Sequence, residues 1–159
     1  MVSGSQSSAL RDTWFGARLP EEELGRLQAL ARSASFEAGS EILREGDLTR
    51  DLGIVVQGRV ALRLRVPERG MTTVLTVEAG EIIGWSAVVP PHRSTSTVIA
   101  VVPTDLMLLD GAALRTELDA DPVLAAAVYR SLLEALADRL TGTRMQLLDL
   151  FSQHRDEPW

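Results

Sequence analysis

The chain has 159 residues, of which 45% are hydrophobic and 24% charged, and its formal net charge is -6. This length favours one domain with a sizeable core, and the mixed composition is typical of a soluble globular protein. There is no cysteine, which excludes disulfides, thiolate metal sites and cysteine nucleophiles. A protein that binds duplex DNA usually carries a basic stripe, and none is visible here, so we expect no direct contact with nucleic acid.

The N-terminal segment predicts neither export nor membrane insertion. Residues 1–12 are rich in serine and glycine, and we expect them to be flexible. They lack the basic start and apolar run of a signal peptide. No stretch of the chain approaches the roughly 18 apolar residues that a membrane span requires. We therefore expect a cytoplasmic protein with no membrane partner.

A helix is expected after this segment. Pro20 followed by three glutamates at 21–23 is a helix start, because acidic side chains favour the positive end of the helix dipole. Leucines then recur at helical spacing, and the pattern predicts a helix through about Ser33 that packs on the rest of the domain.

The region over about 35–110 predicts strands and turns. Apolar residues alternate with polar ones over 60–66, which indicates a half-buried strand with Arg63 and Arg65 facing outward. About eight short strands separated by glycine and proline indicate a β-roll, a jelly-roll double-stranded β-helix. The expected fold class is therefore α+β, mainly β.

Two helices should follow the strands. Residues 111–118 predict a short helix. Asp121 then caps a second helix, and Pro122 occupies its first turn. We expect this second helix to run over about 122–150. A helix of about 28 residues spans about 42 Å, more than one roll needs to cover.

Apolar residues along the long helix alternate three- and four-residue steps. This seam consists of Tyr129, Leu133, Leu136, Leu140, Thr143, Leu147 and Leu150. Heptad spacing of this kind favours a parallel helix pair between two subunits, so we expect a homodimer whose contact is made by the leucines of the seam. The alternative is that the seam packs on its own roll.

One stretch, Gly80–Val98, carries a pattern that suits a phosphate. An apolar run ends at Gly84, a short segment beginning with Trp85 follows, and hydroxyl residues come directly after Arg93. Glycine lets the backbone approach a ligand, N–H groups at a helix start attract anions, and arginine with hydroxyls supplies donors. A polar loop that joins two strands would carry the same pattern, so both interpretations stay open.

The residues from Phe36 to Val66 resemble the opening of the cyclic-nucleotide-binding domains of the Crp/Fnr superfamily. Phe36, Gly39, the Glu-Gly-Asp turn at 45–47 and the Gly-Arg-Val turn at 58–60 stand in that family's order. The resemblance covers roughly residues 20–150. It implies a non-enzymatic regulatory domain whose ligand is a cyclic nucleotide, cAMP or cGMP, and it indicates no other cofactor.

The Gly80–Val98 stretch falls where that family keeps its phosphate-binding cassette, but two diagnostic positions differ. The family glutamate that holds the ribose is Trp85 here, and the family arginine that holds the cyclic phosphate is Ser94, with Arg93 one residue earlier. An indole only donates, so Trp85 either stacks on a base or fills the pocket. The resemblance implies the ligand residues Gly84, Trp85, Ser86, Arg93, Ser94, Thr95 and Ser96, with Arg139 and Thr143 on the long helix.

In the Crp/Fnr transcription factors a winged helix-turn-helix follows the long helix, whereas here a polar tail at 152–159 follows the domain at 13–151. We therefore expect the domain to act through a partner protein. The chain has only two histidines and no Ser-His-Asp pattern, so we expect neither a metal site nor catalytic residues. Two hypotheses stay open: a dimeric sensor for a cyclic nucleotide or another small anion, and a ligand-free interaction module whose pocket Trp85 closes.

Overall fold

The structure is a computed structural model that describes residues 10–13 and 15–153, with side chains as far as residue 149. The flexible segment expected at 1–12 and the polar tail expected at 152–159 lie largely outside the described residues. The elements, with η for a 3-10 helix, are η1 (Gly16–Arg18), α2 (Glu21–Leu30), β1 (Ala31–Phe36), β2 (Glu41–Leu43), β3 (Asp51–Gln57), β4 (Arg59–Val66), β5 (Gly70–Glu78), β6 (Ile82–Ile83), η2 (Trp85–Ala87), β7 (Thr97–Ala100), β8 (Thr104–Asp110), α3 (Gly111–Ala120) and α4 (Pro122–Gln153).

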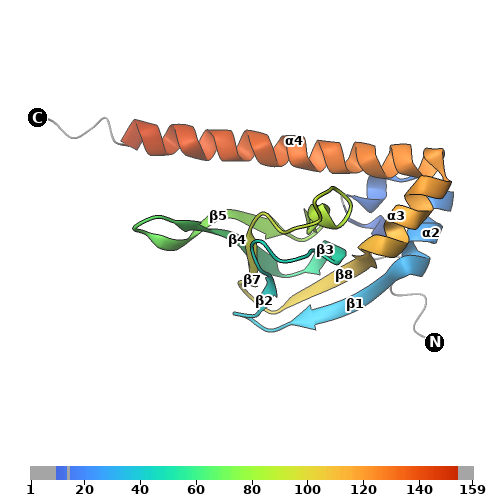
Figure 1. Cartoon of the computed structure of the whole chain (residues 1–159), viewed down its shortest axis with the longest axis horizontal. Helices are drawn as coiled ribbons and strands as arrows, with labels where there is room; N and C mark the ends of the chain where they lie inside the picture. Colours follow the sequence, from blue (N-terminus) through green and yellow to red (C-terminus); the bar gives the residue numbers. More distant parts are fainter. Residues whose placement is uncertain (1–9, 14, 154–159) are drawn as a thin grey trace, which may run out of the picture.

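The strands form two antiparallel sheets of four strands each. Their orders are β1-β8-β3-β6 and β2-β7-β4-β5. Strands from the two ends of the region are neighbours, since β8 pairs with β1 and β3 while β7 pairs with β2 and β4. The long helix α4 runs along one side of this roll, and α2 and α3 lie at one end of it (Figure 1). The expected mainly β roll with an N-terminal helix and a long C-terminal helix is confirmed.

The first strand begins earlier than the sequence pattern predicted. The helical spacing extended to about Ser33, but α2 ends at Leu30 and β1 begins at Ala31. From there β1 pairs with β8 along its whole length, beginning with Ala31 opposite Leu109. Continuous pairing outweighs the weak helix preference of a stretch that contains two serines.

Strand β3 separates the apolar interior into two clusters. Leu52 and Ile54 belong to the cluster beneath the helices, whereas Val55 belongs to the cluster inside the roll. Successive side chains of a strand point to opposite faces, so a strand buried on both sides must be apolar throughout. This explains why β3 shows a continuous apolar run and not an alternating pattern.

Only the first half of α4 packs firmly on the domain. Leu124, Val128 and Leu132 are buried in the cluster beneath the helices. From residue 140 to residue 149 every side chain except that of Thr143 is exposed. In the part of the chain that the structure describes, no helix is long and apolar enough to cross a membrane.

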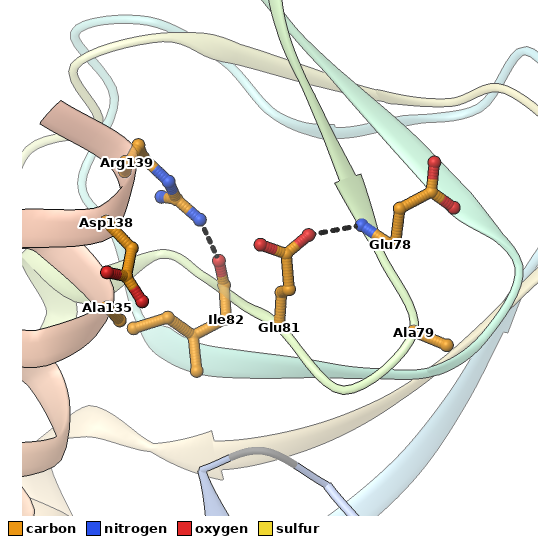
Figure 2. A pocket seen from close by; sticks show the side chains of 7 residues that line it. All are labelled: Glu78, Ala79, Glu81, Ile82, Ala135, Asp138 and Arg139. Carbon is orange, nitrogen blue, oxygen red and sulfur yellow. Dashed lines mark hydrogen bonds between the residues drawn. The ribbon is translucent and has the colours of Figure 1, made fainter. Parts of the chain in front are cut away.

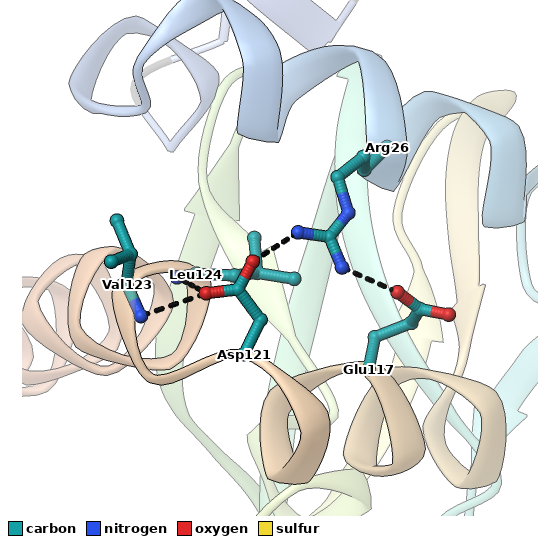
Figure 3. A network of polar contacts seen from close by, with 5 residues as sticks. All are labelled: Arg26, Glu117, Asp121, Val123 and Leu124. Atoms are coloured by element: carbon teal, nitrogen blue, oxygen red, sulfur yellow. Dashed lines mark hydrogen bonds and ion pairs between the residues drawn. The ribbon is translucent and has the colours of Figure 1, made fainter.

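Arg26 on α2 connects this helix to α3 and α4. Its guanidinium donates to Glu117 near the end of α3 at 2.7 Å and pairs with Asp121, the residue that precedes α4 (Figure 3). Asp121 also accepts from the backbone N–H groups of Val123 at 2.9 Å and Leu124 at 3.1 Å. The Leu124 amide and then Arg26 hold the pKa of the Asp121 carboxyl below its usual range. The start of α4 is thereby fixed to two other helices.

The variant Asp121→Asn keeps a side chain that can cap α4 but removes the charge that pairs with Arg26. A carboxyl whose folded pKa lies below its unfolded pKa stabilises the fold above the unfolded value, and this contribution disappears as pH falls through the folded value. We expect the variant to unfold at a lower urea concentration than the wild type at pH 7, and the difference to shrink below about pH 4.

The matched control is Asp110→Asn. Asp110 also caps a helix, by accepting from the Ala113 amide at 2.8 Å, but among the described residues its carboxylate makes no hydrogen bond or ion pair with an arginine. A difference between Asp121→Asn and wild type that stays constant from pH 7 to pH 3 would contradict the role assigned to the ion pair.

Candidate functional site

Gly84 makes the turn from β6 into the short helix η2. Its backbone is left-handed, with φ of 67°, and a Cβ atom at this position would lie 2.5 Å from the carbonyl oxygen of Asp51. Only glycine fits such a position without strain or a clash. The turn brings Trp85 and Ser86 to one side of the roll interior, at the place where the cassette was expected.

The second part of the cassette pairs with the turn that follows β2. The Ser94 amide donates to the Asp47 carbonyl at 2.9 Å, and the Gly46 amide donates to the Ser94 carbonyl at 2.8 Å. Neighbouring side chains of a paired segment point to opposite sides. Ser94 and Ser96 are accordingly buried, whereas Arg93 is exposed.

The guanidinium of Arg93 contacts backbone and not the interior of the roll. Its Nη1 donates to the carbonyl oxygen of Gly46 at 2.8 Å. A second contact joins the loop to η2, because Nδ1 of His92, the residue before Arg93, lies 3.0 Å from the carbonyl oxygen of Ser86. A carbonyl oxygen only accepts, so this bond requires the proton on Nδ1. Both contacts fix Arg93 on the outer side of the loop.

The hydroxyl residues of the cassette border a cavity of about 10 Å³. One water molecule needs about 10–15 Å³, and pockets for small ligands measure about 300–1,000 Å³. The cavity is therefore closed to any nucleotide in this conformation. Its lining residues are Leu43, Leu62, Ile83, Gly84, Trp85, Ser86, Ser94, Thr95, Ser96, Val98 and Arg139.

Most of the residues that the sequence nominated for ligand binding thus lie together around one cavity, and their binding role stays a prediction. Arg93 and Thr143 are not among the lining residues. Thr143 lies along a separate groove of about 640 Å³ between β5 and α4, and its hydroxyl donates to the Arg139 carbonyl at 2.9 Å.

Trp85 has two roles in the packing. It borders the cavity, and it is half-buried against the apolar cluster beneath the helices. The indole therefore connects the cassette to the part of the core that also holds the first half of α4. A change in the cavity that moves Trp85 would reach this cluster directly.

Arg139 brings a positive charge from α4 to the site. Its Nη2 donates to the Ile82 carbonyl at 2.6 Å (Figure 2). Burial lowers the pKa of Arg139, and the Glu81 carboxylate offsets part of this change. Arg139 is the one charged side chain among the residues that line the small cavity in the described part of the chain.

A larger hollow of about 480 Å³ lies on the other side of Arg139. Glu78, Glu81 and Asp138 line it together with Arg139, Ile82 and two alanines (Figure 2). Glu81 is turned toward the backbone of β5, since its Oε2 accepts from the Glu78 amide at 2.7 Å. The two spaces thus differ in charge: hydroxyls and one arginine on the cassette side, carboxylates on the other.

Sequence reasoning missed the apolar part of the cavity. Leu43, Leu62, Ile83 and Val98 line it, and β4 places Leu62 opposite Val98 of β7. The signal was available in the alternation of the strands, which identifies the inward side chains but not the space they enclose. No group of metal-ligating side chains is present among the residues that the structure describes.

Comparisons relate the chain to known proteins. The family model of the cyclic nucleotide-binding domain matches residues 33–121. A solved structure of a candidate cyclic nucleotide-binding protein from Geobacter metallireducens is 28% identical, with a TM-score of 0.76, and the match covers 88% of this chain and 99% of that one. A cyclic nucleotide-binding domain from Methylobacillus flagellatus is 27% identical with the same TM-score of 0.76, covering 82% of this chain and 74% of that one.

A longer relative is also found. A candidate potassium channel protein of Rhodopseudomonas palustris is 24% identical over 131 residues, which is 82% of this chain. The chain spans 30% of the length of that protein. The similarity is therefore to one part of a larger molecule.

Substitution of two glycines by alanine tests the geometry of the cassette turn. Gly84→Ala should lower the free energy of unfolding by about 1–3 kcal/mol, because a left-handed residue gains a Cβ that meets the Asp51 carbonyl. Gly142→Ala, in an exposed turn of α4 with no neighbouring atom within 4 Å, should raise it by up to about 1 kcal/mol. Urea unfolding of both variants measures the two effects, and equal changes in the same direction would contradict the assigned turn.

Proposed function

Because the chain belongs to the cyclic nucleotide-binding domain family, we propose that it is a non-enzymatic regulatory domain that binds a small anionic ligand between the cassette and α4. The observation that carries the proposal is the set of polar residues around one cavity: the buried Ser86, Ser94 and Ser96 and the exposed Thr95, with Arg139 of α4. Hydroxyls and a cation in an otherwise apolar space suit an anion that is partly desolvated.

A cyclic nucleotide, cAMP or cGMP, is the first ligand to consider. Ser94, Thr95 and Ser96 with Gly84 would surround the phosphate, and Trp85 would stack on the base or border the ribose. Arg93 could join them only if the loop left its pairing with the turn at 46–47, where its guanidinium now binds the Gly46 carbonyl.

Binding requires the cavity to enlarge. A space of about 10 Å³ would have to reach the size of a ligand pocket, about 300 Å³ or more. Trp85 and Arg139 are the two large polar-tipped side chains on its border, and both connect it to α4 or to the core beneath α4. Ligand entry would therefore displace side chains that contact α4 or the core beneath it. We propose that α4 transmits the regulatory signal to a partner.

We propose further that the chain acts as a homodimer through α4. Along the seam, Leu133 is 68% exposed, Leu140 52% and Leu147 49%. Leu136 is half-buried, and the side chain of Leu150 lies outside the described residues. An exposed leucine stripe at heptad spacing is stable in water when it is covered by a second helix. A partner protein in the cytoplasm would then receive the signal.

A second function is favoured by the closed cavity. With about 10 Å³ of space and Arg93 on the outside of its loop, the domain could serve as a ligand-free interaction module whose pocket is filled by Trp85 and its neighbours. The two functions predict different responses to nucleotides.

Calorimetric titration separates them. The protein is unfolded and refolded to remove any ligand carried through purification, and cAMP and cGMP are then titrated into it. A sensor should give a saturable signal with a dissociation constant in the micromolar range or below. The triple variant Ser94→Ala, Thr95→Ala and Ser96→Ala loses hydrogen bonds to the charged phosphate. Its affinity for the nucleotide should fall at least about tenfold. If no heat of binding is detected up to millimolar cAMP and cGMP, the sensor function is contradicted and the ligand-free interaction module is favoured.

Glutamates introduced into the seam test the proposed dimer. Leu133→Glu combined with Leu140→Glu should convert the dimer to a monomer at micromolar concentration, because each glutamate would be buried in the helix contact. Leu148→Glu is the matched control, since Leu148 is 61% exposed and lies off the seam on the same helix. Sedimentation equilibrium measures the mass. A wild-type monomer, or an equal effect of all substitutions, would contradict the proposed contact.

A further inference from the structure

A second space lies inside the roll, away from the hydroxyl residues of the cassette. It is a cavity of about 200 Å³ between one sheet and strand β2 of the other. An apolar cavity of about 150 Å³ accepts benzene, whereas pockets for larger ligands measure about 300 Å³ or more. The space therefore suits one branched or aromatic group. We call it the Phe36 pocket, and its lining residues are Arg32, Phe36, Ile42, Leu43, Asp51, Gly53, Ile83 and Leu108.

The register of the sheet places an ion pair at this pocket. Arg32 of β1 and Gly53 of β3 both lie opposite Leu108 of β8, so the three residues share one face. Asp51, two residues before Gly53, lies on that face too. The Arg32 guanidinium reaches across β8 and donates to both carboxylate oxygens of Asp51, at 2.9 and 2.8 Å. The Arg32 side chain is 57% exposed and that of Asp51 20%, which places the pair between the pocket and solvent.

This ion pair keeps unused bonding capacity. A guanidinium has five N–H donors, and a carboxylate has about four acceptor sites. Among the described residues the two side chains bind only each other, with two hydrogen bonds. A ligand that carries both charges can use the remaining donors and acceptors while the pair stays intact. A lone carboxylate would meet Asp51 as a like charge, and a lone ammonium group would meet Arg32 in the same way.

Behind the ion pair the pocket is apolar. The side chains that line it there carry only carbon: Phe36, Ile42, Leu43, Ile83 and Leu108. A polar group would lose its water in this space and find no hydrogen-bond partner on these side chains. An apolar group gains free energy on leaving water. The pocket thus combines a zwitterionic rim with an apolar interior.

We infer that the Phe36 pocket binds an apolar α-amino acid such as leucine or phenylalanine. The ammonium and carboxylate groups of an α-amino acid are attached to one carbon, so they contact Asp51 and Arg32 together while the side chain enters the pocket. This site is separate from the cassette, and the inference does not depend on the proposed anion-binding function. Leu43 and Ile83 line both spaces, so a bound amino acid contacts a wall of the cassette cavity.

Calorimetry with leucine and matched ligands tests the chemistry. Leucine and phenylalanine should bind wild type saturably, with a dissociation constant below about 1 mM. The first two matched ligands are 4-methylpentanoate, which lacks the amine of leucine, and 3-methylbutylamine, which lacks its carboxylate. Serine, the third, keeps the head group without the apolar side chain. Each should bind about five- to tenfold more weakly than leucine. Equal affinity for leucine and any of the three would overturn the assigned ligand class.

Methyl NMR tests the location. In protein with labelled isoleucine and leucine methyl groups, unlabelled leucine should shift the signals of Ile42, Ile83 and Leu108. The signals of Leu124 and Leu132, which belong to the cluster beneath the helices, should stay in place. Shifts that leave out the three pocket residues would overturn the assigned site.

Substitutions test the two parts of the pocket separately. Arg32→Gln should weaken leucine about five- to tenfold. The matched control is Arg59→Gln, because Arg59 also forms an exposed ion pair, with Glu78, but does not line the pocket. Leu108→Phe fills the pocket and should abolish binding. Ile42→Trp fills it from β2 and serves the same purpose if circular dichroism shows that Leu108→Phe does not fold.

Equal effects of Arg32→Gln and Arg59→Gln, or full affinity in a folded variant with a filled pocket, would overturn the inference. Absence of binding of leucine and phenylalanine up to tens of millimolar would also overturn it. Neither result bears on the titrations with cAMP and cGMP, so failure of this site and failure of the proposed function are distinguishable.

Discussion

Two backbone hydrogen bonds between Ser94 and the turn at 46–47 determine which side chains of the cassette face the interior. Because the paired segment alternates sides, they place Ser94 and Ser96 inside and Arg93 outside, where it binds the Gly46 carbonyl. A shift by one residue would exchange these positions. The cavity consequently receives its hydroxyls from the cassette and its positive charge from α4.

Because α4 supplies the positive charge at the cavity, this helix is part of the site as well as part of the fold. Its first half is fixed by buried Leu124, Val128 and Leu132 and by the Arg26–Asp121 pair at its start. Its second half carries an exposed apolar seam. Arg139 lies between these two halves. Its half-buried guanidinium donates to the Ile82 carbonyl and keeps further N–H donors that make no hydrogen bond within the described residues.

Much of the fold was predictable because its signals are local. Proline and acidic residues at 20–23, the alternation over 60–66 and the cap at Asp121 each depend on neighbours within a few residues. The resemblance to the Crp/Fnr domains rests on turns of the same kind. The start of β1 at Ala31 could not be predicted in this way, because it depends on pairing with a strand more than seventy residues later.

The residues of the candidate site could be predicted from the sequence, but the size of the cavity and the orientation of its side chains could not. Ser94 and Arg93 are neighbours in the sequence, and their opposite orientations follow from contacts with Gly46 and Asp47, nearly fifty residues earlier. The closure of the cavity depends on how Trp85 packs on the core, and the bond from Arg139 to Ile82 depends on where α4 crosses β6. These are tertiary facts that periodicity and composition do not contain.

The most direct test of this account is a crystal structure of the refolded protein grown with millimolar cAMP, compared with one grown without it. The account predicts nucleotide between the cassette and α4, with its phosphate beside the hydroxyl residues of the cassette and the Arg139 guanidinium. A cavity still closed at that concentration, with Trp85 in place and no nucleotide bound, would contradict it and favour a scaffold that acts through its surfaces.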